Sequence, residues 1–208
     1  MGIRLVVGLG NPGSKYRDTR HNVGFALTAR LVEAAGWKDW QGLGEWGVRE
    51  VDGRDLWCMR PSTFMNESGR AVRSFAAFHK VPPSDVLVCY GELDLPLGRI
   101  RLRPGGSSAG HRGMQSVIDH LGTQDVPRLR VGIGPLPAGR DGAGFVLGRF
   151  SAGERDAAAA ALGRAAEAVL DAAARGVEHA MNAYNKAADG ADADAGPRRA
   201  EPPPGGGA

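Results

Sequence analysis

The stretch IRLVVGLGNPGSKYRDTRHNVGF, residues 3–25, sets the start of the fold and poses the question of function. A strand-like run leads into the spacing GxGxxG, which in dinucleotide-binding folds turns a strand directly into a helix facing pyrophosphate. Here the residues after Gly13 are too polar for a helix packed on a sheet, and helical periodicity starts only near Val23. Glu33, at the distance expected of a ribose-binding acid, falls inside that helix. The sequence therefore argues against a nucleotide site.

Strand-like and helical segments alternate along the chain, and this order is typical of an α/β sandwich. We predict an α/β fold with a single domain, in which a mixed central sheet is flanked by helices on both faces. Strand-like runs occupy residues 3–8, 46–51, 56–60, 86–90, 98–103 and 129–133, and helical patterns occupy residues 22–35, 67–79, 115–121, 152–175 and 177–187.

The composition limits the class of protein. A chain of 208 residues with 42% hydrophobic residues suits one domain, which we place at residues 1–187. Residues 188–208 are rich in Pro, Gly and Asp without large apolar side chains, so we predict a disordered tail. The net charge of +3 is compatible with an anionic partner and well below that of an arginine-rich binder.

Compartment and cofactors are also constrained. We find neither a secretion-signal pattern nor an apolar run long enough for a bilayer, so we expect a cytoplasmic protein with no membrane partner. Cys58 and Cys89 fall inside strand-like runs, where free cysteines usually act as small buried hydrophobes, so we predict no metal.

Polar residues gather in four loops, where sites are usually built. These loops read NPGSKYRDTRHN (11–22), PSTFMNESG (61–69), GELDLPLG (91–98) and GGSSAGHRGMQ (105–115), and they are followed by RLRVGIG (128–134) and FVLGRF (145–150). In order and spacing over residues 3–150, the chain resembles bacterial-type peptidyl-tRNA hydrolases. The resemblance implies that the first loop belongs to an active site and that no cofactor is needed. It further implies a monomer that binds peptidyl-tRNA at the acceptor end of the tRNA. The enzyme would hydrolyse the ester between peptide and tRNA and so recycle the tRNA.

His21 is the candidate general base, because an imidazole can activate water near neutral pH. The resemblance assigns it this role, whereas a lone histidine before a helix is otherwise a cap or a surface residue. His79, His120 and His179 lack such a context, and we predict structural roles for them.

Other candidate contacts follow from the resemblance. Asn11 and Asn66 match asparagines that grip the substrate, although both also suit turns or helix caps. Tyr16 and Phe64 match positions lining the tRNA-facing groove, where aromatic rings stack on unpaired bases, with core packing the alternative for Phe64. Gly110 and His111 match the start of a glycine-rich loop that covers the site and contacts substrate.

A basic strand face is suggested by Arg99, Arg101 and Arg103, which alternate with apolar residues. Such a face could hold phosphates or could simply be a charged edge that discourages strand pairing. Arg128, Arg130 and Lys80 are candidates to extend it.

Two positions depart from the family pattern. Gly91 stands where the resemblance implies an aspartate that orients the histidine, and Arg112 stands where it implies a substrate-binding asparagine. Neighbouring Glu92 should face the opposite way from Gly91 if the strand continues. Three functions therefore remain open: a hydrolase, slowed or retuned; a catalytically impaired tRNA- or RNA-binding paralogue; or an acyl-tRNA-processing enzyme of a specialised pathway.

Overall fold

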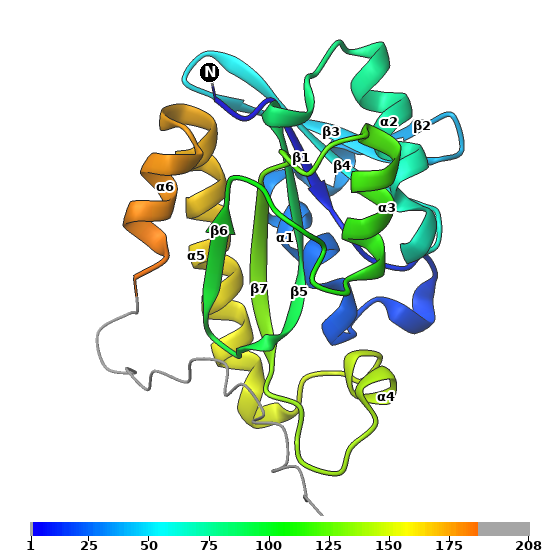
Figure 1. Cartoon of the computed structure of the whole chain (residues 1–208), viewed down its shortest axis with the longest axis vertical. Coiled ribbons are helices and arrows are strands. Elements are labelled where there is room, and N and C mark those ends of the chain that lie inside the picture. Colours follow the sequence, from blue (N-terminus) through cyan, green and yellow to red (C-terminus); the bar gives the residue numbers. More distant parts are fainter. Residues whose placement is uncertain (1, 187–208) are drawn as a thin grey trace, which may run out of the picture.

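The computed structural model describes residues 2–186, and the predicted tail at 188–208 lies outside this range. Seven strands form one mixed sheet in the order β2-β3-β4-β1-β5-β7-β6 (Figure 1). β1 pairs in parallel with β4 and β5, and β5 with β7, whereas the outer pairs β2–β3, β3–β4 and β6–β7 are antiparallel. The strands are β1 (Leu5–Gly8), β2 (Lys38–Trp40), β3 (Gly44–Val51), β4 (Arg54–Pro61), β5 (Val86–Pro96), β6 (Ile100–Arg103) and β7 (Arg128–Gly134).

Helices cover both faces of this sheet. α2 (Ser68–Phe78) and α3 (Arg112–Leu121) pack on one face, and α1 (Val23–Leu31), α5 (Arg155–Arg175) and α6 (Val177–Tyr184) pack on the other (Figure 1). Strand β1 shows why both faces are apolar, because Val6 points into one core while Leu5 and Val7 point into the other. The predicted α/β architecture is confirmed.

Several element boundaries differ from the sequence expectation. α1 ends at Leu31 and not at residue 35, because Val32 is extended, and α3 begins at Arg112, three residues early. Strand β5 continues to Pro96. β2 and the five-residue α4 (Gly142–Val146) were not expected, since both are too short to show a periodicity.

The first loop does not have dinucleotide-binding geometry. Gly13, at φ 103°, leads into two short 3-10 turns, Ser14–Tyr16 and Arg20–Asn22, before α1 begins. α1 lies very close to β1, since a Cβ added to Gly8 would lie 2.2 Å from the main-chain oxygen of Gly24. This close approach fixes the Arg20–Asn22 turn beside the end of the parallel strands.

Candidate active site

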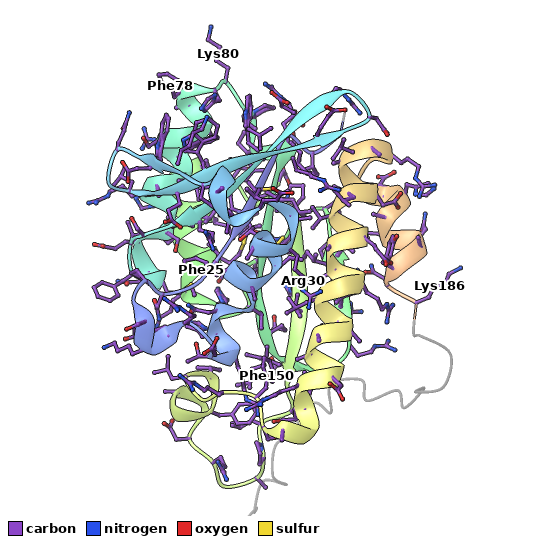
Figure 2. All side chains as sticks on the ribbon, turned by 180° about the vertical axis from the view of Figure 1, so that it is seen from behind. Phe25, Arg30, Phe78, Lys80, Phe150 and Lys186 are labelled. Carbon is purple, nitrogen blue, oxygen red and sulfur yellow. The ribbon has the colours of Figure 1, made fainter. Side chains whose placement is uncertain are left out.

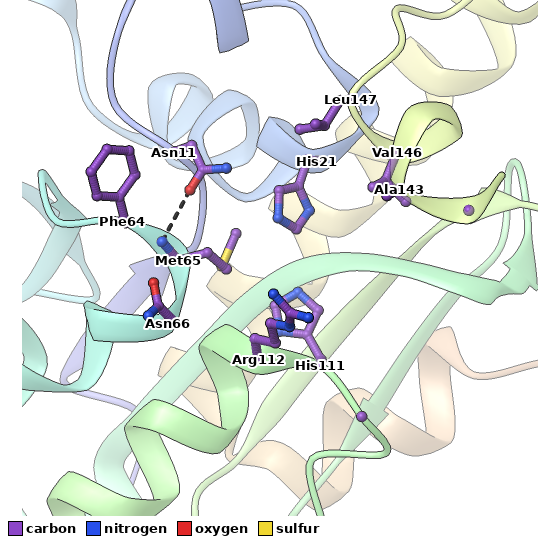
Figure 3. Close-up of a pocket in the computed structure, with 12 residues that line it drawn as sticks. Asn11, His21, Phe64, Met65, Asn66, His111, Arg112, Ala143, Val146 and Leu147 are labelled. Carbon is purple, nitrogen blue, oxygen red and sulfur yellow. Dashed lines mark hydrogen bonds between the residues drawn. The ribbon is translucent and has the colours of Figure 1, made fainter.

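A cavity of about 510 Å³ opens where the chain leaves the carboxyl ends of β1 and β4, the edge at which open α/β sheets bind ligands (Figure 3). It collects residues from the first loop, the loop before α2, the start of α3 and α4. The lining residues are Asn11, His21, Phe64, Met65, Asn66, Gly110, His111, Arg112, Gly142, Ala143, Val146 and Leu147. Of the predicted site residues, Tyr16 and Gly91 are outside this lining.

Asn11 is held in place by hydrogen bonds. Its Oδ1 accepts from the Met65 main-chain N–H at 3.0 Å. Asn22, which is buried, closes the loop by accepting from the Asn11 N–H and donating to the Asn11 carbonyl, both at 2.9 Å. Because Oδ1 is occupied, the Asn11 amide NH₂ is the group that points toward His21 (Figure 3). The supporting role of Asn22 was not predicted from the sequence, although its place in the polar loop was a signal.

His21 lies on the cavity wall, and within residues 2–186 its ring makes no hydrogen bond. Burial lowers the pKa of His21 below its usual 6.5, because desolvation disfavours the imidazolium. The neutral ring therefore prevails near neutral pH, as a general base requires.

Among residues 2–186, no carboxylate forms a hydrogen bond or an ion pair with the His21 ring. Gly91 faces Arg20, Val23 and Ile133 on the α1 side of the sheet. Glu92 pairs instead with Arg130, whose Nη1 lies 3.3 Å from Oε2 of Glu92. Glu92 is thus engaged elsewhere and does not replace a carboxylate at position 91.

His111 caps α3, since its Nδ1 accepts from the Met114 main-chain N–H at 3.1 Å. Its ring stacks on Tyr90, with centroids 4.3 Å apart, and lies 5.9 Å from the His21 ring. Burial, reinforced by His21, lowers the pKa of His111 to about 3. His111 is therefore a rigidly held, neutral imidazole.

The remaining predicted substrate contacts are Phe64, Asn66, Arg112 and Tyr16, and all except Tyr16 line the cavity. Phe64 is 59% exposed on the cavity rim, so it is not a core residue. Asn66 and the exposed Arg112 line both this cavity and a neighbouring hollow of about 390 Å³. Tyr16 lies on the adjacent turn, with Lys15 Nζ 4.8 Å from its ring centroid.

Arg20 joins the turn bearing His21 to the opposite cavity wall. Its buried guanidinium lies between Phe145 and Phe150 and donates from Nη2 to Glu154 Oε2 at 2.6 Å. The Arg20 main-chain N–H also donates to Gly148. Phe145 lies in α4, the helix that supplies Ala143 and Val146 to the cavity, so Arg20 braces this wall. This contact was not predicted from the sequence.

A cluster of arginines lies on β6 and β7. Ile100 and Leu102 are buried while Arg101 and Arg103 are exposed, which confirms the predicted alternation. Arg101 faces Arg130 across the two strands, and burial together with Arg103, Arg130 and Arg99 lowers the pKa of Arg101. We call Arg99, Arg101, Arg103 and Arg130 the arginine cluster; its only ion pair within residues 2–186 is Arg130–Glu92.

Arg128 does not extend this cluster. Arg128 is fully buried, and its guanidinium donates to main-chain carbonyls of Gly106, Ser107, Gln124 and Val126. Lys80 lies at the end of the molecule away from Phe150 (Figure 2). Arg128 is thus excluded from the predicted basic surface, whereas the place of Lys80 in it stays a prediction.

Comparison with known proteins gives the family. Residues 5–192 match the sequence model described as "Peptidyl-tRNA hydrolase". The chain belongs to this family. The peptidyl-tRNA hydrolase of Elusimicrobium minutum is 41% identical over 186 residues, 88% of this chain and 100% of that protein. That of Synechococcus elongatus is 45% identical over 191 residues, 87% and 91% of the two chains.

A solved peptidyl-tRNA hydrolase agrees with the fold. The crystal structure from Acinetobacter baumannii has a TM-score of 0.81 and 36% identity, covering 88% of this chain and 94% of its own. Among residues 2–186, no helix is long and apolar enough to span a membrane. In the same part of the chain, no three His, Cys, Asp or Glu side chains are grouped to bind a metal ion.

Proposed function

We propose that this chain is a peptidyl-tRNA hydrolase that cleaves the ester between a peptide, or an N-blocked aminoacyl group, and the terminal ribose of tRNA. The observation that carries this function is a neutral His21, with no hydrogen-bond partner for its ring among residues 2–186, on the wall of a cavity built by a chain of this family. The reaction releases free tRNA for reuse. We also propose that the chain acts as a monomer, in the cytoplasm where translation occurs.

The chemistry assigns His21 to water activation. His21 takes a proton from water while the hydroxide oxygen bonds to the ester carbonyl carbon. The carbon–oxygen bond to the ribose then breaks, and the ribose oxygen takes up the proton. Water and ester are thus converted to a carboxylic acid and a tRNA hydroxyl, without an oxidant, reductant or cofactor.

The surrounding residues are proposed to hold the substrate. The Asn11 NH₂ and the Asn66 amide can donate to the peptide or ribose without titrating. Exposed Phe64 offers a face on which a terminal base can stack, as does Tyr16 beside the cavity. Gly110 and His111 line the cavity in which the substrate would bind, and the Arg112 guanidinium can bind an anionic group of the substrate.

The arginine cluster fits the tRNA backbone. In the described part of the chain these grouped guanidinium groups have one carboxylate partner, Glu92, so they repel one another, and phosphates would relieve this repulsion. Because phosphate contacts carry much of the binding energy, tRNA affinity should depend mainly on this cluster and not on His21.

Hydrolysis of N-acetyl-aminoacyl-tRNA under single-turnover conditions tests the proposal. Wild type should release the acyl group, and His21→Ala should abolish release while leaving tRNA affinity nearly unchanged. A wild type that binds tRNA without hydrolysing the ester would instead favour the binding paralogue. The loss of activity would follow from Gly91, which leaves His21 without an orienting carboxylate at that position. Equal hydrolysis by His21→Ala would remove His21 as the base.

A further inference from the structure

We propose that His111 is a catalytic residue whose Nε2–H donates a hydrogen bond to the ester carbonyl oxygen as negative charge develops there. This role deepens the proposed hydrolysis and rests on it. His111 remains a hydrogen-bond donor throughout and transfers no proton.

The helix cap determines which ring nitrogen of His111 carries the proton. Because Nδ1 accepts from the Met114 N–H, the proton of the neutral ring must be on Nε2. Stacking on Tyr90 fixes the plane of the ring. The cap and the stack together hold the Nε2–H in one direction.

This donor has no acceptor within the described residues. Nε2 of His111 is buried and without a hydrogen-bond partner, although the residue lines the cavity. A buried donor left unpaired lowers the stability of the fold, so its presence at a site calls for an explanation. An acceptor that arrives with the substrate would remove this cost.

The position of the donor matches the reaction. The His21 ring lies next to the His111 ring, with centroids 5.9 Å apart (Figure 3). Within residues 2–186 the His21 ring makes no hydrogen bond. A small shift of the His21 ring can therefore open Nε2 of His111 to the cavity. An ester placed against both rings would present its carbonyl carbon to the water on His21 and its oxygen to His111.

The charge state also suits this role. A neutral imidazole at a helix amino terminus can polarise a carbonyl, and the helix dipole disfavours its protonation. Because the pKa of His111 is about 3, the Nε2–H donor persists over the whole range in which His21 acts as a base. The two histidines thus have separate tasks, with His21 accepting a proton and His111 stabilising charge.

His111→Asn separates this task from helix capping. An asparagine at this position can accept from the Met114 N–H and so retains the cap, but it lacks the Nε2–H. With N-acetyl-aminoacyl-tRNA we expect kcat to fall on the order of 10²-fold, with KM within a few-fold and the Tm nearly unchanged. His111→Ala loses both the helix cap and the donor. Its kcat should be similar to that of His111→Asn, and its Tm should be lower than that of His111→Asn.

Other outcomes would overturn the assignment. Wild-type kcat in His111→Asn would show that His111 only caps α3, and a rise in KM alone would show a ground-state contact only. An inactive wild type would instead refute the proposed function. Independently of any variant, ¹⁵N spectra of histidine-labelled wild type should show His111 protonated at Nε2 and not titrating between roughly pH 5 and 8. A proton on Nδ1 would refute the proposal.

Discussion

A Cβ added to Gly91 would lie 3.1 Å from the main-chain oxygen of Arg20, the residue that precedes His21. Position 91 is thus directly beneath the turn that carries the base. The Cβ would also lie 3.1 Å from Val23 Cγ2 and 3.2 Å from Ile133 Cδ1, so a side chain there requires small shifts of its neighbours. A carboxylate at this position is close to the base but crowded.

Gly91→Asp should raise turnover at least roughly tenfold, equivalent to about 1.4 kcal/mol of barrier, because the carboxylate orients His21 and stabilises its imidazolium. Single-turnover hydrolysis measures this gain. Gly91→Ala is the matched control, with the same Cβ crowding and no carboxylate, and it should not be faster than wild type. If Gly91→Asp shows no gain while folded, another group already supports His21. Adding Arg112→Asn then tests whether the two positions act together, since neighbouring effects need not be additive.

The acid limb of activity should follow His21. Burial lowers the pKa of His21, so the neutral base persists below the usual 6.5 and kcat/KM should fall only when the pH drops past a midpoint below that value. A pH profile of kcat/KM checks this. In Gly91→Asp the midpoint should move upward, because a nearby negative charge favours the imidazolium. A wild-type midpoint above 6.5 would contradict the desolvated environment.

Arg101→Gln combined with Arg103→Gln should weaken tRNA binding and flatten its salt dependence. Each lost phosphate contact should reduce the slope of log K against log salt by about 0.7–0.9, since fewer counterions are released. Titrations at several salt concentrations give the slope.

Arg49→Gln combined with Arg54→Gln provides the control with equal charge loss. Both arginines are exposed on the β3–β4 hairpin, and in the sheet β1 and β5 lie between this hairpin and the strands β7 and β6 that carry the arginine cluster. The slope should then stay near that of wild type. Equal changes in both double variants would show that net charge, and not the cluster, determines binding.

Glu154→Gln should destabilise the protein at pH 7 by about 1–2 kcal/mol, because Arg20 is buried and loses its charged partner. Arg20, followed by Ser151, lowers the pKa of Glu154 to about 2. The folded-state pKa is below the unfolded value, so this stabilisation is present above about pH 4.5 and is lost as pH falls toward 2.

Urea unfolding at pH 7 and pH 3 measures this difference. Asp18→Asn is the control, because Asp18 and Arg149 form an exposed pair at 3.7 Å, whose loss should change the free energy of unfolding by less than about 1 kcal/mol. A Glu154→Gln effect that is constant with pH would rule out the charged pair as its source.

The sequence by itself determined the fold class and most of the cavity lining. Alternating apolar runs such as residues 3–8 and helical periodicity such as residues 67–79 depend on local spacing, which the chain carries directly. The polar loops after β1 and before α2 supplied His21, Asn11, Phe64 and Asn66, and the topology brings them together as expected.

Only the tertiary structure decided how equivalent residues are used. Arg128 and Arg130 are two residues apart on one strand, yet one is buried on loop carbonyls and the other pairs with Glu92. Arg20 meets Glu154 across 134 residues of sequence. Such contacts depend on long-range packing and on competition among several possible partners for each charged group. No local pattern encodes that competition, because it is settled only when the sheet and loops place all the partners in space.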